Sequence, residues 1–134
     1  MKEMKVQEIA RSSETILLVE DDEMLLDLVK TVLEEQGFHV LAAKDGEKAL
    51  EVYAHHKDEI AVVLSDMGLP RLGGWEILHK MKEINPNAKI ILASGYSDPM
   101  IRSEMLKEGA MDYVSKPYNT DEITKKIREV IEGE

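Results

Sequence analysis

The chain contains no cysteine among its 134 residues. A disulfide framework, a thiolate metal site and a cysteine nucleophile are therefore excluded, and nothing indicates an oxidising compartment. No apolar run approaches the length that spans a membrane, and residues 1–13 lack the apolar core of a secretion signal. These absences predict a cytoplasmic protein with no membrane partner.

Basic residues are scarce relative to acidic ones, with 17 Lys and Arg against 27 Asp and Glu and a formal net charge of −10. This excess of negative charge repels nucleic acid and anionic membrane surfaces, and it favours cations or partners with basic patches. Direct binding to nucleic acid is therefore not expected. The length and the apolar content of 43% fit one domain that buries its own core.

Short apolar runs alternate with segments of helical spacing along the chain. Strands are expected at residues 16–19, 38–42, 61–64, 90–93 and 111–115. Gly37 and Gly109 stand where two of the helices should stop, and Asp45 and Asn119 are predicted to cap two others. This alternation predicts an α/β fold, a doubly wound parallel sheet with helices on both faces.

The helical spacing also predicts which side chains face the core. Leu28 in the first helix and Leu106 in the fourth recur in phase with neighbouring apolar residues, so both are expected on buried faces. His39 lies within the second strand and is expected to face solvent.

Polar side chains follow four of the apolar runs at the point where each strand ends. Glu20 and Asp21 follow the first strand, Asp66 the third, Ser94 the fourth and Lys116 the fifth. The carboxyl ends of parallel strands meet at one edge of the sheet, where ligands bind. Each residue taken alone is equally well explained as a solvated loop residue, because loops after strands are generally polar. The agreement of four strands favours a common site.

Three converging carboxylates would repel one another, so a hard divalent cation is their natural neutraliser. Oxygen ligands and the lack of cysteine favour Mg²⁺, with Mn²⁺ as the alternative, over zinc. The ammonium of Lys116 and the hydroxyl of Ser94 suit an anion bound to that metal, and a phosphoryl group is the commonest such anion. Asp66 is then a candidate nucleophile that forms an acyl phosphate.

The chain resembles the receiver domains of two-component response regulators in four motifs that occur in the family's order. They are Leu-Leu-Val-Glu-Asp-Asp, Leu-Ser-Asp-Met-Gly-Leu-Pro-Arg-Leu-Gly-Gly, Ala-Ser-Gly and Tyr-Val-Ser-Lys-Pro-Tyr. The resemblance implies a receiver domain at residues 15–132, preceded by an extension or linker at residues 1–14. It also implies the flavodoxin-like (βα)5 fold with strand order 2-1-3-4-5.

The resemblance assigns the metal and phosphate chemistry to individual residues. It implies that Asp66 is the phosphoacceptor and that Asp21, Asp66 and the carbonyl of Gly68 contact Mg²⁺. Glu20 stands where Asp is frequent in the family. Its longer side chain is expected to place the carboxylate further out, with a role directly at the metal or through water.

The remaining site residues concern the phosphoryl group and the response to it. The resemblance implies that Lys116 binds the phosphoryl group and is joined to Pro117 by a cis peptide bond. It gives Ser94 and Tyr113 the hydroxyl and aromatic positions of a switch.

The implied function is a phosphoacceptor signalling module that takes a phosphoryl group from a histidine kinase or a histidine phosphotransfer protein. The family switches partner binding through the face of its fourth helix, fifth strand and fifth helix. Such a module catalyses its own phosphorylation and dephosphorylation and is not expected to turn over an external substrate. The downstream partner is not identified, and both a monomer and a weak dimer stay open.

Two settings and two other functions also stay open. The family includes stand-alone regulators and the terminal receivers of hybrid histidine kinases; because only two residues follow the last expected helix, output is expected through partners. A receiver-like interaction domain that is never phosphorylated would fail a test of Mg²⁺-dependent phosphorylation. A true phosphohydrolase would show steady-state turnover of a phosphate ester.

Overall fold

The computed structural model describes residues 14–68, 73–95 and 99–133. Apart from Glu14, the extension expected at residues 1–14 lies outside the described residues, so that expectation stays a prediction. Within the described part of the chain, no helix is both long and apolar enough to cross a membrane.

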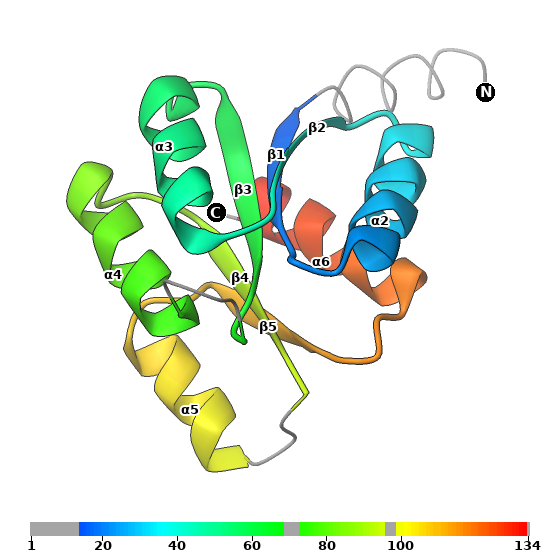
Figure 1. The fold of residues 1–134 in the computed structure, drawn as a ribbon. Helices are drawn as coiled ribbons and strands as arrows, with labels where there is room; N and C mark the ends of the chain where they lie inside the picture. Colours follow the sequence, from blue (N-terminus) through cyan, green and yellow to red (C-terminus); the bar gives the residue numbers. More distant parts are fainter. Residues whose placement is uncertain (1–13, 69–72, 96–98, 134) are drawn as a thin grey trace.

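A single parallel sheet of five strands forms the centre of the molecule (Figure 1). The strands are β1 (Thr15–Val19), β2 (His39–Ala43), β3 (Ile60–Asp66), β4 (Ile90–Ser94) and β5 (Asp112–Ser115). Their order in the sheet is β2-β1-β3-β4-β5, which confirms the predicted order 2-1-3-4-5. All five carboxyl ends therefore point toward the same edge.

Helices cover both faces of this sheet, as the alternating pattern predicts. They are α2 (Glu23–Glu35), α3 (Gly46–His56), α4 (Gly74–Ile84), α5 (Pro99–Lys107) and α6 (Thr120–Gly133). Figure 1 shows α3, α4 and α5 on one face and α2 and α6 on the other. The two faces bury separate apolar clusters, one under each set of helices.

Local sequence signals set the ends of several helices. Asp22 and Asp45 cap α2 and α3 by accepting backbone N–H bonds in the first turn. Asn119 accepts a backbone bond from the first turn of α6, as predicted. Gly37 and Gly109 have φ angles of 98° and 116°, which only glycine adopts at little cost, and the chain turns there after α2 and α5.

Two predictions about buried helix faces are wrong. Leu28 is 51% exposed and Leu106 is 48% exposed. Leu28 lies about 200° around α2 from the buried Leu26, so it points away from the sheet. In α5, Met105 is buried, and the next residue, Leu106, turns outward. The prediction for His39 is confirmed, because its side chain is exposed.

Candidate functional site

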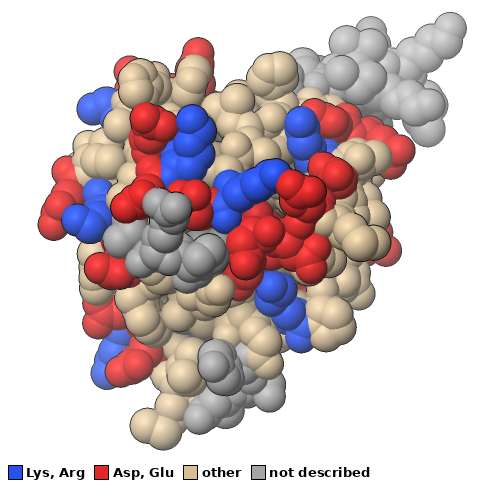
Figure 2. All heavy atoms as spheres, viewed as in Figure 1, with Lys and Arg blue, Asp and Glu red and all other residues tan. Residues whose placement is uncertain are grey.

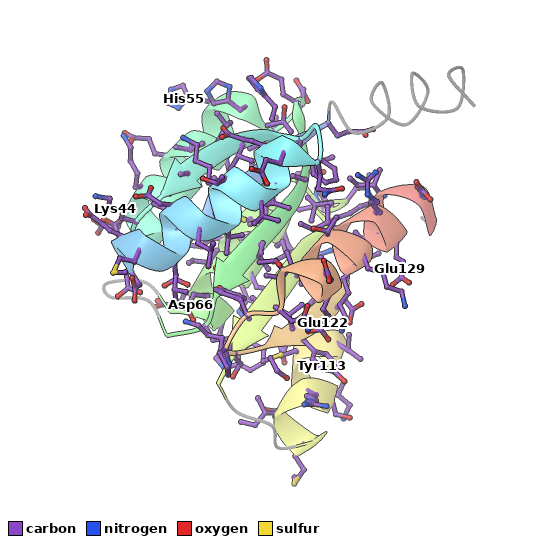
Figure 3. All side chains as sticks on the ribbon, turned by 90° about the vertical axis from the view of Figure 1, so that its right-hand side faces the viewer. Lys44, His55, Asp66, Tyr113, Glu122 and Glu129 are labelled. Atoms are coloured by element: carbon purple, nitrogen blue, oxygen red, sulfur yellow. The ribbon has the colours of Figure 1, made fainter. Side chains whose placement is uncertain are left out.

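The ends of the strands bring the predicted polar residues together in one open pocket of about 580 Å³. Asp66 is the last residue of β3, and Figure 3 shows it at the end of that strand. The pocket is lined by Glu20, Asp21, Asp22, Leu25, Asp66, Met67, Gly68, Ser94, Gly95 and Lys116. Of the residues to which a chemical or switching role was assigned from the sequence, only Tyr113 is not part of this lining.

Asp66 is held in place by donors to both of its carboxylate oxygens. The ammonium of Lys116 donates to Asp66 Oδ2 at 3.0 Å, and the backbone N–H of Gly68 donates to Oδ1 at 3.1 Å. Asp66 is only 5% exposed, yet it lines the open pocket. The carboxylate is therefore both oriented and reachable from solvent.

Three carboxylates converge closely enough to share a cation. One oxygen from each of Glu20, Asp21 and Asp66 lies within 4.8 Å of the others. Oxygen donors of this number and charge fit Mg²⁺, a hard cation that is usually held by one or two carboxylates while it keeps several waters. Figure 2 shows a concentration of acidic side chains near the middle of the visible face, close to the start of α2.

Glu20 does not occupy the outward position that its longer side chain suggested. Its side chain is buried, with 1% exposed. The hydroxyl of Tyr118 donates to Glu20 Oε1 at 3.0 Å, and the backbone N–H of Asp22 donates to Oε2 at 3.1 Å. These two donors replace the water that the carboxylate loses on burial.

The proximity of these groups changes their acidity. Burial raises the pKa of Glu20 above its ordinary value, and the negative charge of Asp66 raises it further, against the opposing effects of its donors and Lys116. Burial alone would lower the pKa of Lys116. The hydrogen bond to Asp66 and the charges of Asp66 and Glu20 together outweigh that effect and raise the pKa. Lys116 therefore stays a cation across the physiological range.

The two predicted switch residues lie in different surroundings. Ser94 is buried at the end of β4 and lines the pocket. Tyr113 lies on β5, half-buried and outside the pocket lining, and Figure 3 shows it beside α5. The guanidinium of Arg102 lies 4.8 Å from the centre of the Tyr113 ring, and the ammonium of Lys126 lies 4.7 Å from it.

Sequence reasoning missed three residues that contact these groups. Tyr118 follows the cis peptide bond between Lys116 and Pro117 and reaches back to the first strand end. The cations of Arg102 and Lys126 come from α5 and α6. The contact between Tyr118 and Glu20 has one sequence signal, a tyrosine two positions after Lys116 combined with glutamate in place of aspartate at position 20.

Comparison with known proteins identifies relatives over most of the chain. Residues 16–128 match the family model described as the response regulator receiver domain. The transcriptional regulatory protein CpxR of Escherichia coli is 36% identical over 116 residues, which are 87% of this chain and 48% of that protein. The sensor kinase CckA of Brucella abortus is 27% identical over 133 residues, 98% of this chain and 14% of that protein.

The fold has counterparts among solved structures. A response regulator receiver domain protein from Clostridium thermocellum superposes with a TM-score of 0.83 at 31% identity, covering 88% of this chain and 94% of that one. The chain spans less than half the length of the two curated relatives above. The likeness therefore concerns one domain of those larger proteins.

Proposed function

The chain belongs to the response regulator receiver domain family, and from that membership we propose that Asp66 is the residue that accepts the phosphoryl group. Receiver domains are phosphoacceptor signalling modules. The observation that supports Asp66 is its contact with Lys116 at the centre of the acidic pocket. Within the acidic triad of Glu20, Asp21 and Asp66, Asp66 has a shorter contact with the ammonium of Lys116 than Glu20 has, at 3.0 Å against 3.5 Å.

Phosphoryl transfer needs little from the protein except positioning and neutralisation of charge. A carboxylate oxygen of Asp66 attacks phosphorus, and the bond from phosphorus to the donor nitrogen breaks. The donor is the phosphohistidine of a histidine kinase or a phosphotransfer protein, and its imidazole leaves with the electron pair. The ammonium of Lys116 then binds an oxygen of the transferred group.

The acidic triad supplies the metal ligands in this proposal. Asp21, Asp66 and the carbonyl of Gly68 hold Mg²⁺, and Glu20 acts directly or through water. When bound, the metal neutralises charge shared between the carboxylates and the phosphoryl oxygens. The number of oxygen donors and their mutual distances support this assignment.

The response to phosphorylation is assigned to the face formed by α5, β5 and α6. The hydroxyl of Ser94 moves toward a phosphoryl oxygen, and Tyr113 exchanges its present position for a more buried one. Such a change shifts an existing equilibrium, so the phosphoryl group must interact better with one arrangement than with the other. Couplings of this kind are typically about 1 to 3 kcal/mol.

The proposal extends to the setting of the domain. Residues 15–132 form the receiver domain and residues 1–14 the preceding extension or linker. The similar proteins include a receiver domain protein matched over 94% of its chain and a sensor kinase, so a stand-alone regulator and the terminal receiver of a hybrid histidine kinase both fit. In either setting the chain receives its phosphoryl group from a histidine-bearing protein.

Intact mass measured with acetyl phosphate and Mg²⁺ tests the assignment of Asp66. The wild-type chain should gain one phosphoryl group, and Asp66→Asn should gain none. Asp27→Asn, which neutralises an exposed acid on α2 outside the pocket lining, should behave as wild type. A phosphate adduct that persists on Asp66→Asn would contradict the proposal, and a wild-type chain that never gains phosphate would favour the interaction domain instead.

The role of Ser94 has a separate test. Beryllofluoride with Mg²⁺ mimics the acyl phosphate and allows NMR spectra to be compared before and after its addition. The wild-type chain should show shift changes around Tyr113 and α5, and Ser94→Ala should lose most of them. Equal changes in both proteins would exclude this hydroxyl as the relay.

A further inference from the structure

The carboxylate of Glu20 is fixed by groups from two distant parts of the chain. One oxygen accepts the backbone N–H of Asp22, and the other accepts the hydroxyl of Tyr118, which is 98 positions away in the sequence. The ammonium of Lys116 also lies 3.5 Å from the second oxygen, Oε1. Because Glu20 is buried, these donors decide where its carboxylate points.

Tyr118 is itself well placed to act as a fixed donor. Its ring packs against the apolar cluster beneath α2 and α6, and the ammonium of Lys116 lies 5.5 Å from the ring centre. The hydroxyl donates to Glu20 Oε1 at 3.0 Å, and Tyr118→Phe removes this donor while keeping the ring.

Without the hydroxyl, the ammonium of Lys116 at 3.5 Å would be the partner that remains for Oε1 of Glu20 among the described residues. The carboxylate would then be drawn closer to this cation, and its orientation relative to the other two acids would change. Mg²⁺ demands near-octahedral geometry, so the orientation of each acidic group around it matters. Partners that orient a metal ligand typically change metal affinity by about 10- to 100-fold when removed.

We propose that Tyr118 is a positioning residue for the metal site, and that its hydroxyl adapts the pocket to glutamate at position 20. The inference rests on the proposed function, because it assumes that the acidic triad holds Mg²⁺. It goes beyond that function by making metal affinity depend on a residue outside the pocket lining. A glutamate has one methylene more than an aspartate. The Tyr118 hydroxyl holds the carboxylate of this longer side chain near those of Asp21 and Asp66.

A double-mutant cycle between Tyr118→Phe and Glu20→Asp tests the inference, with the Kd for Mg²⁺ measured by calorimetry without any phosphodonor. In the wild-type background, Tyr118→Phe should raise the Kd about tenfold. In the Glu20→Asp background, the shorter carboxylate falls short of the hydroxyl, so the same substitution should change the Kd less than about twofold.

Tyr53→Phe is the matched control, because it removes the hydroxyl of a buried tyrosine under the opposite face of the sheet. Both Tyr→Phe variants should lower the melting temperature in chelator, but only Tyr118→Phe should change the Kd. An unchanged Kd in Tyr118→Phe would overturn the inference and leave the residue a purely structural role. An equal loss of Mg²⁺ affinity on Tyr118→Phe in the wild-type and Glu20→Asp backgrounds would also overturn it.

The outcome can be separated from that of the proposed function. Phosphorylation of Asp66, read by intact mass, tests the function without reference to Tyr118. If the wild-type chain accepts phosphate while the cycle shows no coupling, only the inference fails. If the wild-type chain binds no Mg²⁺, both fail together.

Discussion

Lys116 Nζ lies 3.0 Å from Asp66 Oδ2 and 3.5 Å from Glu20 Oε1, so one ammonium serves two carboxylates of the triad. Both carboxylates are buried, and Lys116 is mostly buried beside them. The ammonium therefore partly neutralises the charge that Mg²⁺ would otherwise neutralise. In the proposed site, the lysine and the metal would therefore compete electrostatically for the same acids.

Lys116→Met should separate these two effects. Removing a positive charge a few ångströms from the triad should tighten Mg²⁺ binding by roughly three- to tenfold. Loss of the ammonium that is proposed to bind a phosphoryl oxygen should slow phosphorylation by acetyl phosphate about tenfold or more. Calorimetry and intact mass measure the two quantities.

The control is Lys44→Met, since Lys44 pairs with the exposed Glu23 outside the pocket lining. It should change the Mg²⁺ Kd and the phosphorylation rate little. Weaker Mg²⁺ binding in Lys116→Met would show that the lysine positions the acids more than it competes for them.

Gly74 is required for the packing of α4 against the loop after β3. A Cβ at this position would lie 2.6 Å from Met67 Sδ and 2.9 Å from the backbone Cα of Met67. Gly74→Ala should therefore lower the free energy of unfolding by about 2 kcal/mol in urea titrations. At the neighbouring Gly73, the nearest atom would be 4.0 Å from the added Cβ, so Gly73→Ala should cost about 0.5 kcal/mol. Equal unfolding midpoints would contradict the steric argument.

Tyr53 should make the protein sensitive to alkali. Burial raises the pKa of its hydroxyl above the ordinary value of 10.0, although a hydrogen bond from Asn85 opposes the shift. The folded chain thus keeps a proton that the unfolded chain loses. The associated stability is fully present below about pH 10 and is lost as the pH rises above it.

Tyr53→Phe removes this ionisation, at a cost of about 1 kcal/mol at neutral pH for the lost hydrogen bond. The gap in unfolding free energy between wild type and variant should narrow between about pH 8 and about pH 11. Urea titrations at the two pH values measure it. A constant gap would mean that Tyr53 does not titrate differently in the two states.

Much of this site could be predicted from the sequence, because strand ends in a parallel sheet are determined by local patterns. The apolar run before Asp66 and the helical spacing after it sufficed to place that carboxylate at the sheet edge. The direction of the Glu20 side chain could not be predicted in this way. The Glu20 carboxylate contacts Tyr118, which is 98 positions away in the sequence and is brought beside it by the tertiary fold.

The environment of Tyr113 also could not be predicted from sequence patterns, since it depends on how α5 and α6 pack on β5. Arg102 donates to the Tyr113 hydroxyl at 3.4 Å and to Ser115 Oγ at 3.3 Å. Lys126 donates to the backbone carbonyl of Tyr113 at 2.6 Å and pairs with Asp112 at 3.3 Å. The two cations hold the ring in its present position, between α5 and α6.

Arg102→Ala should make the switch easier to operate. A cation over an aromatic ring contributes about 0.5 to 1 kcal/mol at exposed sites, and this contribution favours the present position of Tyr113. Its loss should tighten beryllofluoride binding in the presence of Mg²⁺ by about two- to fivefold, because less energy is needed to move the ring. Arg128→Ala is the control, since Arg128 also belongs to α6 but its guanidinium lies over the ring of Phe38. If both arginine variants bind beryllofluoride as the wild type does, Arg102 does not restrain the ring, and the position of Tyr113 must be set by its packing alone.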